Sequence, residues 1–290
     1  MCRLFAMTGG RKPVHATFWL LEAPDSLSRQ SHREPDGTGL GYYDDDGHPI
    51  VSKQAVAAFR DGDFAREARE VRSRTFVAHV RYASTGGLSE RNTHPFEQDD
   101  RLFAHNGVIE GLDLLEAELG DAMSLVSGDT DSERFFALIT RETRRTGDVG
   151  EGITAAARWV AAHLPLFAIN LVLISAEELW TLRYPDSHDL LVLERTAGGP
   201  DGGAHLAHSS PHGRIRVHSS DLADQRAVVI ATERMDDDPA WTPLDSGELL
   251  HVDADLVVTR RRVLDGPPAH PLTLQDLGDT AAASQSPQTR

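Results

Sequence analysis

Apolar positions fall in short runs near both ends of the chain and at helical spacing in its middle. Residues 2–7 are mostly apolar and stop at a Gly-Gly turn, and residues 75–82 combine β-branched with aromatic side chains. Both stretches predict β-strands. The pattern also predicts an amphipathic helix over 14–22, a hairpin over 40–51 with an acidic tip, and a short strand over 102–105.

The middle of the chain predicts helices. Residues 111–119, a stretch opening at Gly128–Glu133 and residues 151–164 carry apolar side chains at helical spacing. Strands are expected to resume at 167–175 and 179–184, with shorter ones at 189–194, 214–218, 227–232, 248–252 and 255–263. This order of strands, helices and strands predicts an α+β fold with two sheets and helices packed outside them.

Domain organisation follows from the same pass along the chain. We find no linker composition that would divide it, so one domain is expected, covering residues 2–265. From about Asp276 the chain is rich in Ala, Ser, Gln and Thr, and residues 276–290 are therefore expected to form a disordered tail.

Composition excludes several classes of protein. The net charge of −16 and the lack of a long Lys/Arg block argue against a nucleic-acid-binding surface. No apolar run reaches the ~18 residues that a membrane span needs, and the first residues lack the pattern of a signal peptide. A single cysteine excludes an internal disulfide, which predicts a reducing, cytoplasmic compartment.

That cysteine, Cys2, stands directly after the initiator Met. If Met1 is removed, Cys2 carries both a thiol and a free α-amine, and an amine with a pKa near ~8 can accept the thiol proton. This is the arrangement of an N-terminal nucleophile, in which one residue supplies nucleophile and base. From position alone, a small buried hydrophobic residue is the simpler interpretation.

Three sequence clusters favour the nucleophile over the buried hydrophobic residue as the interpretation of Cys2. They are His79-Val80-Arg81-Tyr82-Ala83-Ser84-Thr85-Gly86, Ala104-His105-Asn106-Gly107-Val108-Ile109 and Gly128-Asp129-Thr130-Asp131-Ser132-Glu133. Taken singly, each has an ordinary structural explanation. Arg81 would form a surface salt bridge, Asp131 would cap a helix, and Asn106-Gly107 would form a turn. In this order behind a Met-Cys start, they resemble the motifs of the class II glutamine amidotransferases.

The resemblance implies the four-layer αββα sandwich of the N-terminal-nucleophile hydrolases, with Cys2 as nucleophile. It assigns oxyanion stabilisation to the Asn106 amide and the Gly107 backbone N–H. Arg81 is suited to bind the α-carboxylate of glutamine and Asp131 its α-ammonium group. Tyr82 and Ser84 belong to the same substrate-binding block. His79 and His105 are expected to be structural hydrogen-bonding groups near the site.

The resemblance extends to the stand-alone branch of the family. Asp36–Gly41 is similar to an Asp-Gly-Trp-Gly segment, with Thr38 in place of Trp, which puts any pocket wall made by that ring in question. Residues 231–241 are similar to a Ser-Glu-Pro-Leu…Trp segment, with Arg234 in place of Pro. This branch includes the γ-glutamyl amidohydrolase of ergothioneine biosynthesis.

We therefore predict an amidohydrolase that needs no cofactor and cleaves the γ-carboxamide of glutamine or a γ-glutamyl amide through a Cys2 thioester. Two alternatives remain open: a dedicated γ-glutamyl hydrolase of small-thiol (ergothioneine-like) biosynthesis, and a catalytically silent regulatory subunit. A synthase partner that receives the ammonia is a further open question. No metal site is expected, since the acidic tip at residues 44–46 and the histidines of residues 205–218 are interpreted as solvated loops.

Overall fold

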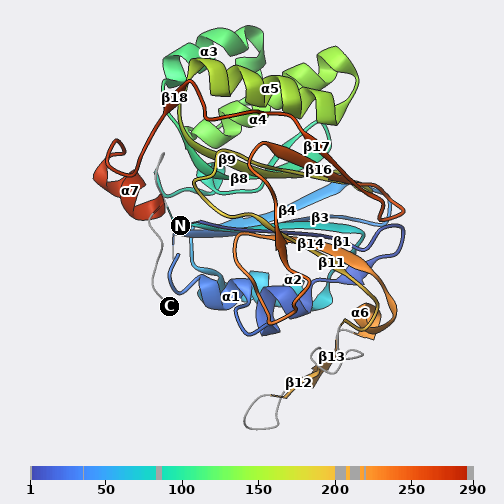
Figure 1. Ribbon diagram of the computed structural model, residues 1–290. Coiled ribbons are helices and arrows are strands. Elements are labelled where there is room, and N and C mark those ends of the chain that lie inside the picture. Colours follow the sequence, from blue (N-terminus) through green and yellow to red (C-terminus); the bar gives the residue numbers. More distant parts are fainter. Residues whose placement is uncertain are drawn as a thin grey trace.

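The computed structural model describes residues 2–34, 36–82, 87–199, 207–209, 216–218 and 220–285. Figure 1 shows two sheets stacked face to face, with helices covering the outer face of each. The predicted four-layer αββα sandwich is therefore confirmed. Within the described residues, no helix combines the length and the apolar character that crossing a membrane requires.

The first sheet contains the expected nucleophile strand at its centre. Its strands run in the order β15-β11-β14-β1-β6-β3-β4. Strand β1 pairs antiparallel with β14 on one side and with β6 on the other, where Arg3 lies opposite Val80. The bounds are β1 Arg3–Thr8, β3 Gly37–Tyr43, β4 Pro49–Gln54, β6 Thr75–Arg81, β11 Leu191–Arg195, β14 Ala227–Ala231 and β15 Thr242–Pro243.

The second sheet follows the order β17-β16-β10-β9-β8-β7, and β18 pairs with β9. Strand β8 is longer than the sequence pattern predicts, because it continues through Asn106 and Gly107 to Ile109. The bounds are β7 Phe96–Gln98, β8 Arg101–Ile109, β9 Pro165–Ile174, β10 Leu179–Arg183, β16 Glu248–Val252, β17 Val258–Arg262 and β18 His270–Pro271. Two small ribbons pair β2 Val14–His15 with β5 Arg72–Ser73, and β12 Ala207–Ser209 with β13 Arg216–His218.

Helices form the two outer layers (Figure 1). The layer over the second sheet consists of α3 Leu112–Leu119, α4 Asp131–Thr146 and α5 Val149–His163. The layer over the first sheet includes α1 Leu27–Gln30 and α2 Gly62–Glu70, while α6 Ser220–Asp224 and α7 Asp279–Gln285 lie at the margins. Short helical turns occupy Phe18–Glu22, Ala58–Arg60, Glu90–Asn92 and Gly120–Leu125.

Side-chain alternation along β1 divides its residues between two cores. Leu4 and Ala6 belong to the core between the sheets, and Phe5 and Met7 belong to the core under the outer helices. By the same alternation, the side chain of Cys2 lies on the inter-sheet face and that of Arg3 on the outer face. The start of β1 therefore faces two different environments.

A glycine in β3 allows this strand to contact the segment that precedes β7. A Cβ on Gly39 would lie 1.9 Å from the carbonyl oxygen of His94, so a side chain at this position is excluded. Strand β3 can therefore lie directly against the His94–Pro95 segment, which leads into β7.

The structure corrects two local expectations and adds one helix. Residues 14–22 form a short strand and one helical turn over Phe18–Glu22, not a continuous helix, although Trp19 and Leu20 are buried as expected. The nine-residue helix α2 was not predicted. Residues Asp279–Gln285 of the expected disordered tail form α7, because Leu277, Ala281 and Ala282 pack against apolar residues of β8 and β9. The assigned domain extent of 2–265 stays a prediction.

Candidate functional site

Cys2 lies just before β1, where its thiol meets the end of β6. The Sγ atom accepts a hydrogen bond from the backbone N–H of Tyr82 at 3.2 Å and lies 3.3 Å from the Tyr82 carbonyl oxygen. Burial raises the pKa of the Cys2 thiol to about 11. The thiol is therefore protonated near neutral pH and needs a base at the moment of attack.

Arg81, the last residue of β6, is 4% exposed, and its positive charge acts on the Cys2 thiol. Its guanidinium donates to the Gly87 carbonyl at 3.3 Å. Burial lowers its pKa from the ordinary value, and the negative charges of Cys2, Asp36 and Asp131 oppose that shift. A buried, permanently charged group beside the thiol is suited to bind a carboxylate.

The second sheet brings Asn106 to Cys2. The Asn106 Nδ2 donates to the backbone carbonyl of Cys2 at 3.1 Å, and its Oδ1 has no hydrogen-bond partner among the described residues. Gly107 lies so close to β9 that a Cβ would stand 1.8 Å from the Ala168 carbonyl oxygen. Only glycine permits this approach, so β8 can pair closely with β9 at the position of the expected backbone donor.

Asp131 begins α4 and is 2% exposed. The N-cap of this helix is Thr130, whose hydroxyl accepts from the Glu133 N–H. The Asp131 Oδ2 accepts the N–H of Ile109 at 2.9 Å, which ties the start of α4 to the end of β8. Its charge reaches both Arg81 and His105, so it belongs to the same electrostatic cluster as Arg81.

The two expected structural histidines differ. His105 lies 2.9 Å from the Ser132 hydroxyl through Nδ1 and 3.2 Å from the Ala168 carbonyl through Nε2. His79 packs between the sheets with its ring centroid 4.3 Å from that of His94, and neither ring has a hydrogen-bond partner within the described part of the chain. Burial lowers the pKa of His79 to about 3, so the ring is neutral.

The structure says less about Tyr82 and Ser84, the two other expected substrate-binding residues. Tyr82 contacts the Cys2 thiol through its backbone N–H and carbonyl. Ser84 lies outside the described residues, and its assignment stays a prediction.

A cluster of charged side chains on the outer face of β1 was not found by sequence reasoning. Arg3 is completely buried and lies 2.8 Å from Glu233 and 3.8 Å from Glu34. Glu233 also pairs with Arg33 at 3.4 Å, and Arg33 reaches Asp25 at the same distance. The available signal was Arg3 itself, an arginine inside an otherwise apolar strand.

A cavity of about 580 Å³ lies at the outer end of this cluster, lined by Pro24, Asp25, Arg33, Arg234, Met235, Asp236 and Asp237. Through Arg33 and Glu233 it connects to Arg3, which lies on the face of the sheet opposite the Cys2 thiol. Arg234, the departure from the family pattern, is exposed in its wall. The cavity is therefore separate from the inter-sheet cluster that contains Cys2.

Thr38, the second departure, also lies on the outer face. It is 1% exposed, its hydroxyl donates to the Val56 carbonyl at 2.9 Å, and the next residue on the same face, Leu40, belongs to the outer core. The side chain at this position therefore points away from the Cys2 thiol, and the exchange of Trp for Thr does not remove a wall from the inter-sheet face.

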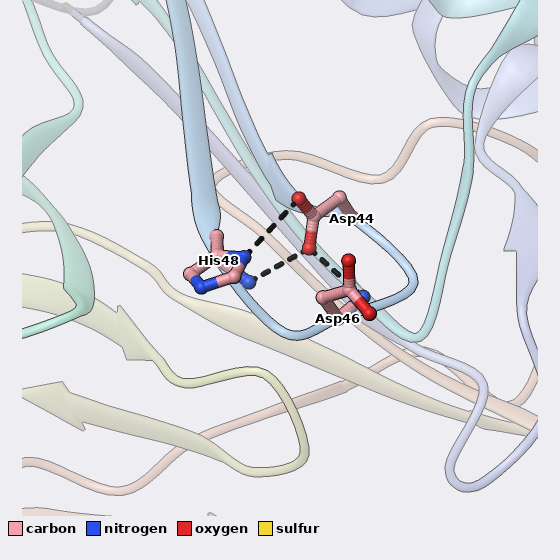
Figure 2. Close-up of side chains that lie close together, drawn as sticks. All are labelled: Asp44, Asp46 and His48. Carbon is pink, nitrogen blue, oxygen red and sulfur yellow. Dashed lines mark hydrogen bonds and ion pairs between the residues drawn. The ribbon is translucent and has the colours of Figure 1, made fainter.

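The acidic hairpin tip places Asp44, Asp46 and His48 close together (Figure 2). One Asp44 carboxylate oxygen accepts the backbone N–H groups of Asp46 and His48, and the other lies 3.5 Å from the His48 ring. These contacts account for the cluster as a stabilised turn. Of the histidines in residues 205–218, His205 and His212 fall outside the described residues.

Comparison with known proteins identifies the family of this chain. The model of the class-II glutamine amidotransferases matches residues 1–266. The uncharacterized protein MJ1515 of Methanocaldococcus jannaschii is 28% identical over 284 residues, covering 91% of this chain and 73% of its own.

One further relative and one solved structure are similar to this chain. The probable glutamine amidotransferase DUG3 of Saccharomyces cerevisiae is 31% identical over 160 residues, covering 48% of this chain and 44% of its own. A solved glutamine aminotransferase class-II domain protein from Silicibacter pomeroyi has the same fold, with a TM-score of 0.59 at 19% identity; the match covers 90% of this chain and 99% of that one.

Proposed function

The chain belongs to the class II glutamine amidotransferases, and on that premise we propose that it hydrolyses the γ-carboxamide of glutamine or of a γ-glutamyl amide. The observation that carries the proposal is the convergence of Cys2, Arg81 and Asn106 in one buried cluster between the two sheets. A silent regulatory subunit would have no need for a thiol, a cation and an amide donor in this arrangement.

In the proposed reaction, the Cys2 Sγ attacks the carboxamide carbon while the thiol proton passes to the α-amine of the mature N-terminus. The electron pair of the C=O bond moves to its oxygen, which the Asn106 amide and the Gly107 N–H stabilise. The α-ammonium then returns its proton to the leaving nitrogen as the C–N bond breaks. Water hydrolyses the resulting γ-glutamyl thioester.

The amino-acid end of the substrate is held by opposite charges. Arg81 binds the α-carboxylate and Asp131 accepts the α-ammonium group, which fixes the γ-carbon near the Cys2 Sγ. Asp131 accepts the Ile109 N–H through Oδ2 at 2.9 Å and the Ser132 hydroxyl through Oδ1 at the longer distance of 3.5 Å. The group on the γ-nitrogen is left variable, and a small-thiol γ-glutamyl compound is included in the proposal.

The free thiol that this chemistry requires favours a reducing compartment, and we propose a cytoplasmic location on that ground. Ammonia released from glutamine passes either to water or to a synthase partner.

The test is glutamate release by the mature protein from glutamine and a panel of γ-glutamyl amides, with Cys2→Ser as the inactive control. N-acetyl-glutamine and glutamine methyl ester should be hydrolysed at least ~100-fold less efficiently than the best substrate, because each leaves a buried charge unpaired. Equal kcat/KM for blocked and free head groups would refute the roles of Arg81 and Asp131. Glutamate release by Cys2→Ser at the wild-type rate would refute the nucleophile.

A further inference from the structure

The charged cluster on the outer face of β1 begins at the residue next to the nucleophile. Arg3 lies between two carboxylates, Glu233 at 2.8 Å and Glu34 at 3.8 Å. These come from segments far apart in sequence: Glu34 precedes β3, and Glu233 follows β14. Arg3 thus joins the two loops that flank the first residues of β1, and it holds the start of the strand in place.

Burial is uneven across the cluster. The side chain of Glu34 is 0% exposed, whereas those of Glu233 and Asp25 are 29% and 26% exposed. Counting Arg3 and Arg33 against Glu34, Glu233 and Asp25, the five side chains carry one more negative than positive charge. The most deeply buried carboxylate, Glu34, is also the one in this cluster whose charge acts on Cys2, and the net negative charge of the cluster favours a nearby cation.

The field of Glu34 reaches the nucleophile. Its negative charge acts on Cys2 and raises the pKa of the thiol, in addition to the larger effect of burial. A carboxylate that only hindered thiol ionisation would oppose catalysis. The same residue carries a second titratable group, the α-amine of the mature N-terminus, and a neighbouring carboxylate stabilises the protonated form of an amine.

We propose that Glu34 is a positioning residue for catalysis, whose carboxylate stabilises the α-ammonium group formed when the Cys2 amine takes the thiol proton. This inference rests on the proposed function, in which the mature chain begins at Cys2. The S–H bond breaks, an N–H bond forms on the amine, and the Sγ–C bond to the substrate forms with the freed electron pair. Glu34 itself stays ionised and exchanges no proton.

The two sides of the nucleophile then have complementary tasks. On the inter-sheet face, Asn106 and Gly107 stabilise the oxyanion that forms on the substrate. On the outer side, Glu34 stabilises the positive charge that forms on the enzyme at the same moment. Separated charges that appear together are thus each met by a preorganised partner, which is the general basis of electrostatic catalysis.

The decisive variant is Glu34→Gln, which keeps the size of the side chain and removes its charge. Because Cys2 is the only cysteine, its alkylation by iodoacetamide reads the thiol–amine pair directly and requires no substrate. Removing a nearby negative charge lowers the pKa of both groups, so the alkylation midpoint should move to lower pH by about one unit. The acid limb of kcat/KM should move in the same direction, and kcat should fall about 3- to 10-fold.

Other charges face this pair and stay unchanged in the variant: Arg3, Arg33, Asp36, Arg81, His188 and Glu233. Asp25→Asn is the matched control, because it removes a carboxylate from the far end of the same cluster. Its alkylation midpoint should equal that of the wild type. Glu34→Asp keeps the carboxylate but moves it away by one methylene group. Its alkylation midpoint should lie between those of the wild type and Glu34→Gln.

An unchanged or raised midpoint in Glu34→Gln overturns the inference. If that variant does not fold, as judged by its thermal transition, Glu34→Asp decides the question, and a wild-type midpoint there overturns it. A protein that shows the alkylation shift but releases no glutamate from any γ-glutamyl compound would refute the proposed function and leave the pairing of Glu34 with the N-terminal amine standing.

Discussion

Cys2 and Arg3 are neighbours in sequence, yet their side chains lie on opposite faces of the first sheet and in different chemical surroundings. Around Cys2 the polar partners include the Asn106 amide, backbone groups and the guanidinium of Arg81, on which the charge of Asp131 acts. Around Arg3 they are carboxylates and a second arginine. The inter-sheet face combines hydrogen bonds and neutral imidazoles with the charges of Arg81 and Asp131, whereas the outer face is organised by ion pairs.

The inter-sheet face surrounds the reactive thiol, whereas the outer face holds the start of β1 in place. A reactive thiol needs donors positioned for a transition state, whereas a strand end needs strong, unvarying contacts to its neighbouring loops. Because side chains alternate along a strand, adjacent residues serve both needs without competing for the same space. We therefore expect outer-face variants to affect mainly the stability of the fold, and inter-sheet variants to affect mainly the rate. Glu34 is the exception, since its charge acts on both.

The largest effect on stability is expected from Arg3→Met, which leaves Glu34 buried without its guanidinium. Removing one partner of a buried ion pair costs about 3–5 kcal/mol of unfolding free energy, because the remaining charge stays desolvated. Urea unfolding followed by circular dichroism measures this. Arg11→Met is the matched control, since the Arg11–Asp255 pair is exposed and its loss should change stability little. Equal stability of Arg3→Met and the wild type would show that the outer cluster does not anchor β1.

Asn106→Ala addresses the inter-sheet face. Loss of one oxyanion donor should lower kcat by about 10²–10³ and leave KM near its starting value, because the interaction strengthens only in the transition state. Asn170→Ala is the control, since Asn170 lies opposite Asn106 on β9 but hydrogen-bonds to backbone groups of His188 and Tyr184. That variant should lose stability and retain kcat once folded. A raised KM with unchanged kcat in Asn106→Ala would make Asn106 a binding residue.

Lowering the pH should reduce the unfolding free energy through the buried histidines of the inter-sheet face. Burial lowers the pKa of His79 to about 3, below the unfolded value of ~6.5, so the unfolded chain binds more protons in between. Its contribution is complete above pH ~6.5 and is lost as pH falls towards 3, at about 1.4 kcal/mol per pH unit. His79→Gln should reduce the slope of unfolding free energy between pH 6 and 4 by that amount.

The matched control for this slope is His163→Gln, whose imidazole lies at the exposed end of α5. Glu34 should act with the opposite sign, because burial raises its pKa above the unfolded value, so that between the two values the folded chain binds more protons than the unfolded chain. If His79→Gln leaves the slope unchanged, His79 is protonated in the fold and the assignment of neutral imidazoles to the inter-sheet face is wrong.

Much of the fold was predictable because local pattern and tertiary environment agree. The apolar runs of β1, β6 and β9 and the capped start of α4 are explained by their own residues. The predictions fail where tertiary packing, and not the local sequence pattern, determines the secondary structure. Residues 14–22 read as one helix, but the chain uses Val14–His15 to pair with β5. The tail residues Asp279–Gln285 read as disordered by composition, yet helix α7 forms where Gln285 reaches His188.

By itself, the sequence determined the chemistry available to this protein: one thiol next to the chain start, followed by three motifs in a fixed order. It also determined that Cys2 and Arg3 would face opposite ways if they shared a strand. Only the tertiary structure decided that Glu34 and Glu233, about 200 residues apart, would both meet Arg3. The physical reason is that an ion pair depends on distance in space, and loops converge on a strand end through the packing of whole sheets.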